Sequence, residues 1–246
     1  MRLALLSDIH ANREGLDACL ADARRRGYDR LAFLGDIVGY GADPAAAIET
    51  VRAEVGKGAI ALLGNHDAAI DGDDSNLNRV ARAALAWQRT QLSAEQRAFL
   101  RELPLTAELD DVTMVHATAC APRGWEYVLD NDSAERCIRA SEGRVTFCGH
   151  VHAPALWLLA HNGTAQPHRP AIGLATPLSA PRRWLAVIGS VGQPRDHSPA
   201  AGYAIFDTEL SEITFLRVPY DCEAAARKIL AAGLPENLAL RLMQGQ

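Results

Sequence analysis

Residues 2–12 read Arg-Leu-Ala-Leu-Leu-Ser-Asp-Ile-His-Ala-Asn, a short apolar run that ends in a polar cluster. Such a run is typical of a buried β-strand, here over residues 2–7. The residues that follow, 13–26, place Leu16, Leu20 and Ala23 on one face, and Gly27 comes directly after them. This spacing predicts an amphipathic helix that ends at the glycine. The chain therefore begins with a strand followed by a helix.

The same alternation continues through the next segments. Residues 31–34 and 59–63 are short apolar runs, and Pro44 suits the first turn of a helix that continues to about residue 53. A βαβαβ order implies a parallel sheet covered by helices. Further helices are expected at 78–91, 93–103, 133–140, 223–232 and 235–243. Further strands are expected at 106–109, 112–117, 144–148, 155–160, 184–188, 203–207 and 213–218.

The stretch 162–182 is rich in Pro, Gly and Ala, which favours a long hairpin or a rim loop inside the strand-rich half. No repeat or linker interrupts the chain. We therefore predict one α/β domain over residues 1–246. It should contain two sheets, the first mostly parallel and the second mostly antiparallel.

Composition excludes several classes of protein. The 246 residues are 48% hydrophobic and 22% charged, values typical of a globular chain with a sizeable core. A net charge of −5 argues against binding of extended nucleic acid, and no apolar window is long enough to span a membrane. The five cysteines show no CxxC spacing, so neither a disulfide framework nor a zinc ribbon is expected. Free thiols indicate a cytoplasmic location.

Residue types that bind metals follow five of the apolar runs. The segments are Asp8-Ile9-His10, Gly35-Asp36, Gly64-Asn65-His66-Asp67, His116 and Gly149-His150-Val151-His152. The carboxyl ends of parallel strands form one edge of a sheet, so segments distant in sequence can meet there. Oxygen and nitrogen ligands without thiolate suit manganese, iron or zinc better than calcium or copper(I). The sequence therefore predicts a metal site at this edge.

The order DxH, GD, GNHD, H, GHxH resembles that of the calcineurin-like metallophosphoesterases, and the small prokaryotic branch in particular. The resemblance covers Leu3 to about Asp207 and includes the strings 7–12, 35–41 and 190–196. Gly39-Tyr40-Gly41 follows the GD motif, where the protein Ser/Thr phosphatase branch has Asp-Arg-Gly. The resemblance implies a four-layer αββα sandwich of two mixed sheets flanked by helices.

The resemblance also implies roles for individual residues around two divalent ions of manganese, iron, zinc or nickel. The first ion would be held by Asp8, His10, Asp36 and His152. The second would be held by Asp36, Asn65, His116 and His150, with Asp36 as the bridge. His66 would face the leaving group, and Asp67 would orient the His66 ring. These assignments imply hydrolysis of a phosphodiester or a phosphomonoester by a metal-bridging hydroxide.

The substrate is expected to be a small phosphate ester or a nucleotide. Arg195 and Arg123 lie in loops from which they could clamp a phosphate, and Tyr40 belongs to the expected rim. Trp125 and Tyr127 could stack on a nucleobase or an aryl group, or simply pack in the fold. The sequence does not decide whether diesters or monoesters are preferred, which metal is native, or which oligomeric state the protein adopts.

Two functions other than phosphoesterase are alternatives for such a chain. One is a non-catalytic scaffold that uses the same fold for protein–protein contacts, whose members typically lose ligands or the leaving-group histidine. This chain keeps all of them, including His66. The other is a DNA-processing nuclease, which would carry a capping domain and a basic groove that a short acidic chain does not suggest. We therefore expect a metal-dependent phosphoric ester hydrolase.

Overall fold

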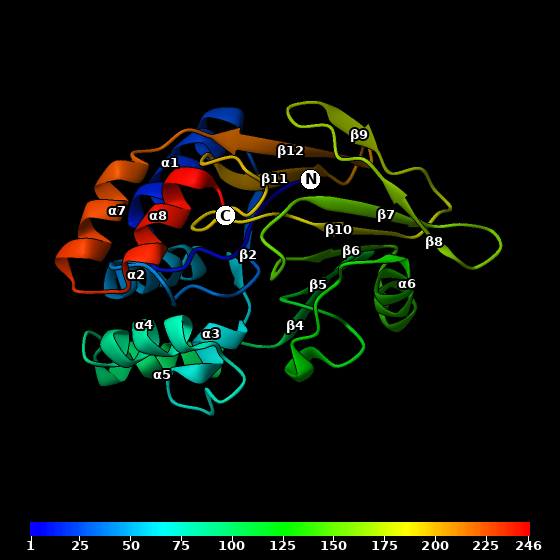
Figure 1. Ribbon diagram of the computed structural model, residues 1–246. Helices are drawn as coiled ribbons and strands as arrows, with labels where there is room; N and C mark the ends of the chain where they lie inside the picture. The colour runs from blue at the N-terminus through cyan, green and yellow to red at the C-terminus, as the bar shows by residue number, and fades with distance from the viewer.

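Two six-stranded sheets pack face to face in the computed structural model, which describes residues 1–246 (Figure 1). The first sheet has the order β3 (Ile60–Ala61), β2 (Arg30–Phe33), β1 (Arg2–Leu6), β11 (Ala201–Asp207), β12 (Glu212–Val218) and β9 (Ala175–Pro177). The second has the order β4 (Thr106–Leu109), β5 (Val112–Val115), β6 (Val145–Cys148), β10 (Trp184–Val187), β7 (Ala155–Leu159) and β8 (Ala165–His168). Helices flank both sheets, which confirms the predicted α/β sandwich.

Both sheets are mixed, as the resemblance implies, so the prediction that the first sheet is mostly parallel is wrong. β1, β2 and β3 are parallel, but β11, β12 and β9 complete their sheet in antiparallel register. In the second sheet β5, β6 and β10 are parallel, with antiparallel strands at both edges. Each sheet thus contributes a set of parallel strands whose carboxyl ends can carry functional groups.

The helices are α1 (Arg13–Arg26), α2 (Pro44–Val55), α3 (Asn65–Ala69), α4 (Arg79–Arg89), α5 (Ala94–Glu102), α6 (Asn131–Ala140), α7 (Cys222–Ala231) and α8 (Glu236–Gln244). α1 packs on β11 and β12, whereas α6 covers β7, β8 and β10 (Figure 1). Asn12 starts α1 by accepting a hydrogen bond from the backbone N–H of Gly15 at 3.0 Å. All helices except the five-residue α3 were predicted.

Alternation along the strands explains the layers. In β1, Leu3 and Leu5 face the second sheet, while Ala4 and Leu6 face α1 and α2. Because successive side chains of a strand point to opposite faces, a strand with both sets apolar must be covered on both sides. The four layers follow from this pattern.

The stretch 162–182 connects the two sheets. Its first part closes the hairpin between β7 and β8, as predicted, and its second part contributes β9 to the other sheet through pairing with β12. It is therefore more than a rim loop. No helix has the length and apolar character required to cross a membrane.

Candidate metal centre

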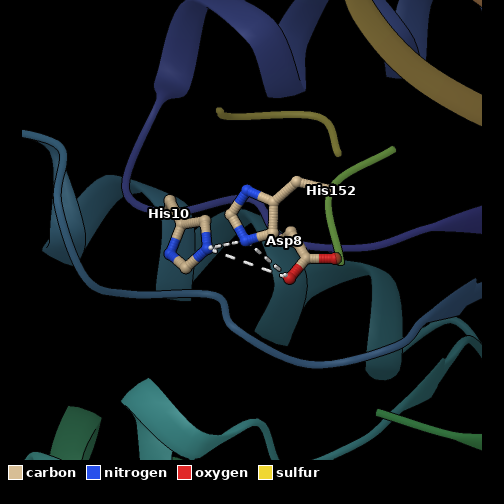
Figure 2. A group of neighbouring side chains, drawn as sticks. All are labelled: Asp8, His10 and His152. Carbon is tan, nitrogen blue, oxygen red and sulfur yellow. Dashed lines mark hydrogen bonds and ion pairs between the residues drawn. The ribbon is translucent and has the colours of Figure 1, made fainter. Parts of the chain in front are cut away.

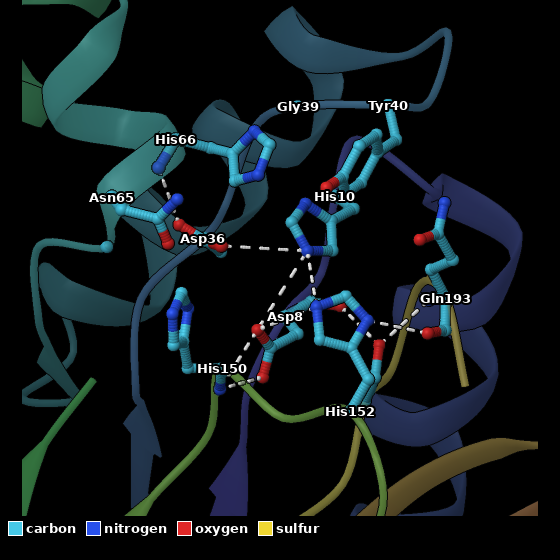
Figure 3. A network of polar contacts seen from close by, with 12 residues as sticks. Asp8, His10, Asp36, Gly39, Tyr40, Asn65, His66, His150, His152 and Gln193 are labelled. Carbon is cyan, nitrogen blue, oxygen red and sulfur yellow. Dashed lines mark hydrogen bonds and ion pairs between the residues drawn. The ribbon is translucent and has the colours of Figure 1, made fainter. Parts of the chain in front are cut away.

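The predicted ligands come together where parallel strands end. Asp8 and His10 follow β1, Asp36 follows β2, His116 follows β5, and the His150–His152 segment follows β6. Figure 3 shows the side chains of Asp8, His10, Asp36, His150 and His152 converging on one region. The two sheets together therefore build one site, as expected for parallel strands whose carboxyl ends share an edge.

The backbone at this site is strained. Asp8, His10, Asp36, His150 and His152 all have φ between +49° and +67°. A residue other than glycine adopts this left-handed region rarely, and such residues concentrate at functional sites because the surrounding structure must hold them there. The positive φ angles turn the chain sharply after each strand and aim the side chains at one another.

The first cluster contains Asp8, His10 and His152, all buried (Figure 2). One Asp8 carboxylate oxygen lies 3.8 Å from Nε2 of His10 and 3.3 Å from Nε2 of His152. Nδ1 of His10 donates to the carbonyl of Val38 at 2.9 Å, and Nδ1 of His152 donates to that of Gln193 at 2.6 Å. In the neutral rings both Nε2 atoms then carry lone pairs, and they face each other at 3.1 Å. A cation between them would relieve their repulsion.

The second cluster repeats this arrangement. Nδ1 of His116 donates to the carbonyl of Leu34 at 2.7 Å, so its Nε2 carries the lone pair in the neutral ring. That Nε2 lies 3.1 Å from Oδ1 of Asn65, 3.2 Å from Nδ1 of His150 and 3.4 Å from Oδ2 of Asp36. A carbonyl, two imidazoles and a carboxylate thus converge around one point.

Asp36 joins the two clusters. Its Oδ2 lies 3.6 Å from Nε2 of His10 and 3.4 Å from Nε2 of His116. Burial favours the neutral acid, but the adjacent imidazoles outweigh it and hold the pKa of Asp36 well below its usual range. Burial likewise opposes a charged His116, yet the negative charge of Asp36 raises the pKa of this histidine to about 9. The centre therefore attracts positive charge, and its carboxylate, amide and imidazole donors fit divalent transition-metal ions.

His66 lies beside both clusters, and one of its ring nitrogens forms a third group with His10 and Asp36 in which the ligand atoms lie within 4.8 Å of one another. Its backbone N–H donates to Oδ1 of Asp36 at 2.8 Å, and its ring packs edge-on against His10, with centroids 4.9 Å apart. Tyr40 covers the ring at a centroid distance of 4.5 Å. Nδ1 of His66 is buried with no hydrogen-bond partner, and burial lowers the pKa of the ring to about 4.

Asp67 does not orient the His66 ring, so this part of the prediction is wrong. Its two carboxylate oxygens accept hydrogen bonds from the backbone N–H groups of Val38 and Gly64, each at 3.0 Å. Burial and the nearby charge of Asp36 raise the pKa of Asp67 to about 7, although these backbone bonds oppose the shift. Asp67 therefore fastens the loop after β2 to the start of α3.

Comparison with known proteins agrees with the geometry. The family model of the calcineurin-like phosphoesterase superfamily domain matches residues 1–211. The chain belongs to this superfamily. The helices α7 and α8 lie beyond the matched region of this calcineurin-like phosphoesterase.

Relatives extend the similarity of this calcineurin-like phosphoesterase over its whole length. An uncharacterized protein of Methanocaldococcus jannaschii is 35% identical and is covered over 98% of its length by 99% of this chain. A metallophosphoesterase structure from Sphaerobacter thermophilus is 38% identical with a TM-score of 0.88, covering 100% of this chain and 99% of that one. A hypothetical protein from Pyrococcus horikoshii, 22% identical, shares the fold with a TM-score of 0.79 over 100% of this chain and 98% of its own.

Two arginines predicted to contact substrate lie on different sides of the candidate metal centre. Arg195 lies on the Tyr40 side, where its guanidinium carbon is 5.7 Å from the ring centroid and one of its nitrogens is 2.9 Å from the side-chain oxygen of Gln193. Its backbone N–H donates to the carbonyl of His152 at 3.2 Å. Arg123 lines a cleft that reaches Asn65 and His150.

Two residues that support the site were not among the predicted site residues. Gln88 is fully buried and binds both the N–H of Gly39 at 2.7 Å and the carbonyl of Gly41 at 2.7 Å. It continues the buried face Ala81, Ala84, Leu85 of α4, and a glutamine in that register was the available signal. Ser190, after β10, donates to the carbonyl of Asp8 at 2.9 Å.

Proposed function

We propose that this chain is a phosphoesterase that uses two divalent metal ions to hydrolyse phosphodiesters or phosphomonoesters. One observation carries the proposal. Imidazole nitrogens whose hydrogen bonds direct their lone pairs inward face each other in two adjacent clusters, and a single carboxylate, Asp36, lies between them. Paired cation sites that share a carboxylate suit phosphoryl chemistry.

The residues divide between the two ions as the geometry groups them. Asp8, His10, Asp36 and His152 would hold the first ion, and Asp36, Asn65, His116 and His150 the second. Manganese, iron, zinc or nickel fits these donors. When bound, such ions supply an activated water at neutral pH and neutralise charge on the phosphoryl group.

The chain's own groups would complete the reaction. A water oxygen forms the new bond to phosphorus while the bond to the ester oxygen breaks, so charge develops on that oxygen. One ring nitrogen of His66 lies within 4.8 Å of ligand atoms of Asp36 and His10, and His66 would donate a proton or a hydrogen bond to the leaving oxygen. Arg195 and Tyr40 would hold the substrate on this side, and Arg123 on the other.

Activity assays with matched substrates test this proposal. The protein would be stripped of metal, reconstituted with manganese, zinc, nickel or magnesium, and given bis-p-nitrophenyl phosphate or p-nitrophenyl phosphate. We expect metal-dependent release of p-nitrophenol, and the faster of the two substrates would assign the diester or monoester class. Two bound ions without turnover of either ester would favour the non-catalytic scaffold instead.

A further inference from the structure

We propose that the cleft beside the second cluster binds a planar aromatic base, so that the substrate is a nucleotide ester. In this arrangement the base belongs to the arm that stays on phosphorus. This inference rests on the phosphoesterase function proposed above and deepens it. It concerns the cleft between the segment from α3 to α4 and the segment 123–127, a cleft of about 350 Å³ that opens directly onto Asn65 and His150.

One wall of this base cleft is aromatic. Tyr127 stacks on the His150 ring with centroids 4.0 Å apart and an angle of 19°. Trp125 meets the His116 ring edge-on at 5.9 Å, and its φ of +53° holds it in the left-handed region. Although Tyr127 stacks on His150, 48% of the residue is still exposed, and it lines the cleft. Exposed aromatic faces of this kind are the usual platforms for bases.

The opposite wall is small and apolar. Ala68, Ala69, Gly72 and Leu77 line it, which leaves room for a flat group against the aromatic wall. Gly72 cannot be enlarged freely, since a Cβ atom there would lie 2.6 Å from the carbonyl oxygen of Ala68. The exposed amide of Asn76 lies on the same lining and can both donate and accept, as hydrogen bonding to a base edge requires.

Two charged residues line the cleft, Arg123 and Asp73, and the Asp73 carboxylate already accepts hydrogen bonds from the backbone N–H and the hydroxyl of Ser75. Arg123 is exposed and forms no ion pair within the chain, whereas Arg136 on α6 pairs with Glu126 at 3.9 Å. An unpaired guanidinium beside an aromatic platform suits a ligand that carries both a ring and a phosphate. A nucleotide combines these two features, and a simple alkyl phosphate has only one.

The position of His66 decides which arm enters the cleft. His66 packs against His10 and Tyr40, whereas the cleft lies against His150 and His116. The arm opposite the leaving group is therefore the one that the cleft holds.

Binding of two matched ligands tests the cleft without any turnover. Adenosine 5′-monophosphate and ribose 5-phosphate share the sugar and phosphate and differ only in the base. Calorimetric titration of the metal-stripped protein should show at least about tenfold tighter binding of adenosine 5′-monophosphate. Equal affinity, or no binding of either ligand at millimolar concentration, would overturn the inference.

Variants then locate the effect. Tyr127→Leu keeps an apolar cover on His150 but removes the flat ring, and Ala68→Leu narrows the cleft from the other wall. Both should abolish the difference between the two ligands. Leu129→Ala is the matched control, because Leu129 is 66% exposed on the same segment and does not line the cleft. Tighter binding of the adenosine ligand that survives both cleft variants would place the base elsewhere.

Activity with a constant leaving group separates this inference from the general function. Thymidine 5′-p-nitrophenyl phosphate and methyl p-nitrophenyl phosphate both release p-nitrophenol and differ in the arm that remains. The metal-loaded protein should prefer the nucleoside ester by about tenfold in kcat/KM, and Ala68→Leu should remove that preference. Hydrolysis of both esters at equal kcat/KM would reject only the proposal that the cleft binds a base. Hydrolysis of neither ester would reject the phosphoesterase function, and the binding comparison would then decide whether the cleft binds a base.

Discussion

At the scale of single residues, backbone carbonyl groups define the centre as much as its side chains do. Leu34, Val38 and Gln193 each accept a hydrogen bond from Nδ1 of a clustered histidine. This contact fixes the ring orientation and leaves Nε2 as the inward-facing nitrogen. A carbonyl is uncharged and cannot be removed by substitution, so the ring orientation is independent of nearby side chains.

Asp36→Asn should reduce metal binding at both clusters. The substitution removes the only carboxylate that faces His10 and His116 together, and an amide is a weaker ligand for divalent ions. Metal content per chain after dialysis, measured by mass spectrometry, should fall well below that of the wild type. Asp17→Asn, an exposed change on α1, is the control. Retention of the full metal content by Asp36→Asn would contradict the bridging role.

His66→Asn should separate metal binding from catalysis. Its ring belongs to neither cluster of ligands proposed here, so metal content should stay at the wild-type value, whereas turnover should fall by about 10²–10⁴-fold. Single-turnover hydrolysis of bis-p-nitrophenyl phosphate measures the chemical step directly. An unchanged single-turnover rate would show that His66 does not act on the leaving group.

Much of the site could be predicted from the sequence at this scale, because ligand types recur after apolar runs. The predicted ligands do converge from both sheets. The sequence could not show whether Asp67 contacts the His66 ring, because adjacent residues in a chain need not face each other. The positive φ angles were equally invisible, because they depend on tertiary contacts rather than on residue type.

At the scale of secondary structure, a buried polar contact joins α1 to the first sheet. The hydroxyl of Tyr203 on β11 donates to Asp22 of α1 at 2.7 Å, and Arg26 reaches the same carboxylate at 2.7 Å. Burial favours the neutral acid, but the Tyr203 hydroxyl and the Arg26 guanidinium together hold the pKa of Asp22 below its usual value. The contact therefore stabilises the ionised carboxylate in the folded state.

Tyr203→Phe should lower the free energy of unfolding by about 1.5 kcal/mol at neutral pH. Because the folded-state pKa of Asp22 lies below the unfolded value of about 3.9, this stabilisation is present above about pH 4 and is lost as the pH falls further. Urea unfolding at pH 7 and pH 3 should show the difference from wild type shrinking at the lower pH. Tyr28→Phe is the control, and a difference independent of pH would exclude this explanation.

Most elements could be predicted because their apolar residues alternate or repeat with helical spacing. The exceptions have physical reasons. α3 has five residues, too few for a helical period, and it is held by Asp67 bonding to the N–H of Gly64. β8 and β9, with four and three residues, lie in the stretch 162–182 and are too short to show a clear alternation. β9 forms through pairing with β12, which comes later in the chain.

At the scale of the whole molecule, α7 and α8 support one side of the centre. Their apolar residues pack in one cluster with Tyr40 and with Ala81 and Ala84 of α4. Lys228 of α7 lies 2.6 Å from Glu14 and 2.6 Å from Asp43, so one cation links α1 and the loop after Tyr40. These C-terminal helices thus hold the segments that carry His10 and Tyr40.

Lys228→Met should destabilise the fold by about 1 kcal/mol, because it leaves two carboxylates facing each other without a cation; the half-exposed position limits the effect. Lys57→Met is a matched control, since Lys57 is the only other lysine and its side chain, which pairs with Glu54, is 66% exposed against 39% for Lys228. Urea unfolding of both variants makes the comparison. A smaller loss for Lys228→Met than for Lys57→Met would contradict the supporting role.

Strand order could not be predicted at this scale. The sequence pattern of β11 is that of a buried strand in either sheet and in either direction, and only packing places it beside β1. The predicted sandwich was confirmed because apolar residues on both faces of the strands demand cover on both sides, whereas the partners of each strand depend on the whole chain.

The position of β1 has a consequence for how the protein is made. β1 is synthesised before β2 and β11, yet it lies between them in its sheet. Its register with β11, from Arg2 opposite Asp207 to Leu5 opposite Ala204, cannot form until the chain has been synthesised as far as β11. Pairings between distant segments form slowly, and an unpaired strand edge is prone to aggregate. The nascent chain therefore carries the apolar strand that leads to Asp8 with one edge open until β11 has been synthesised.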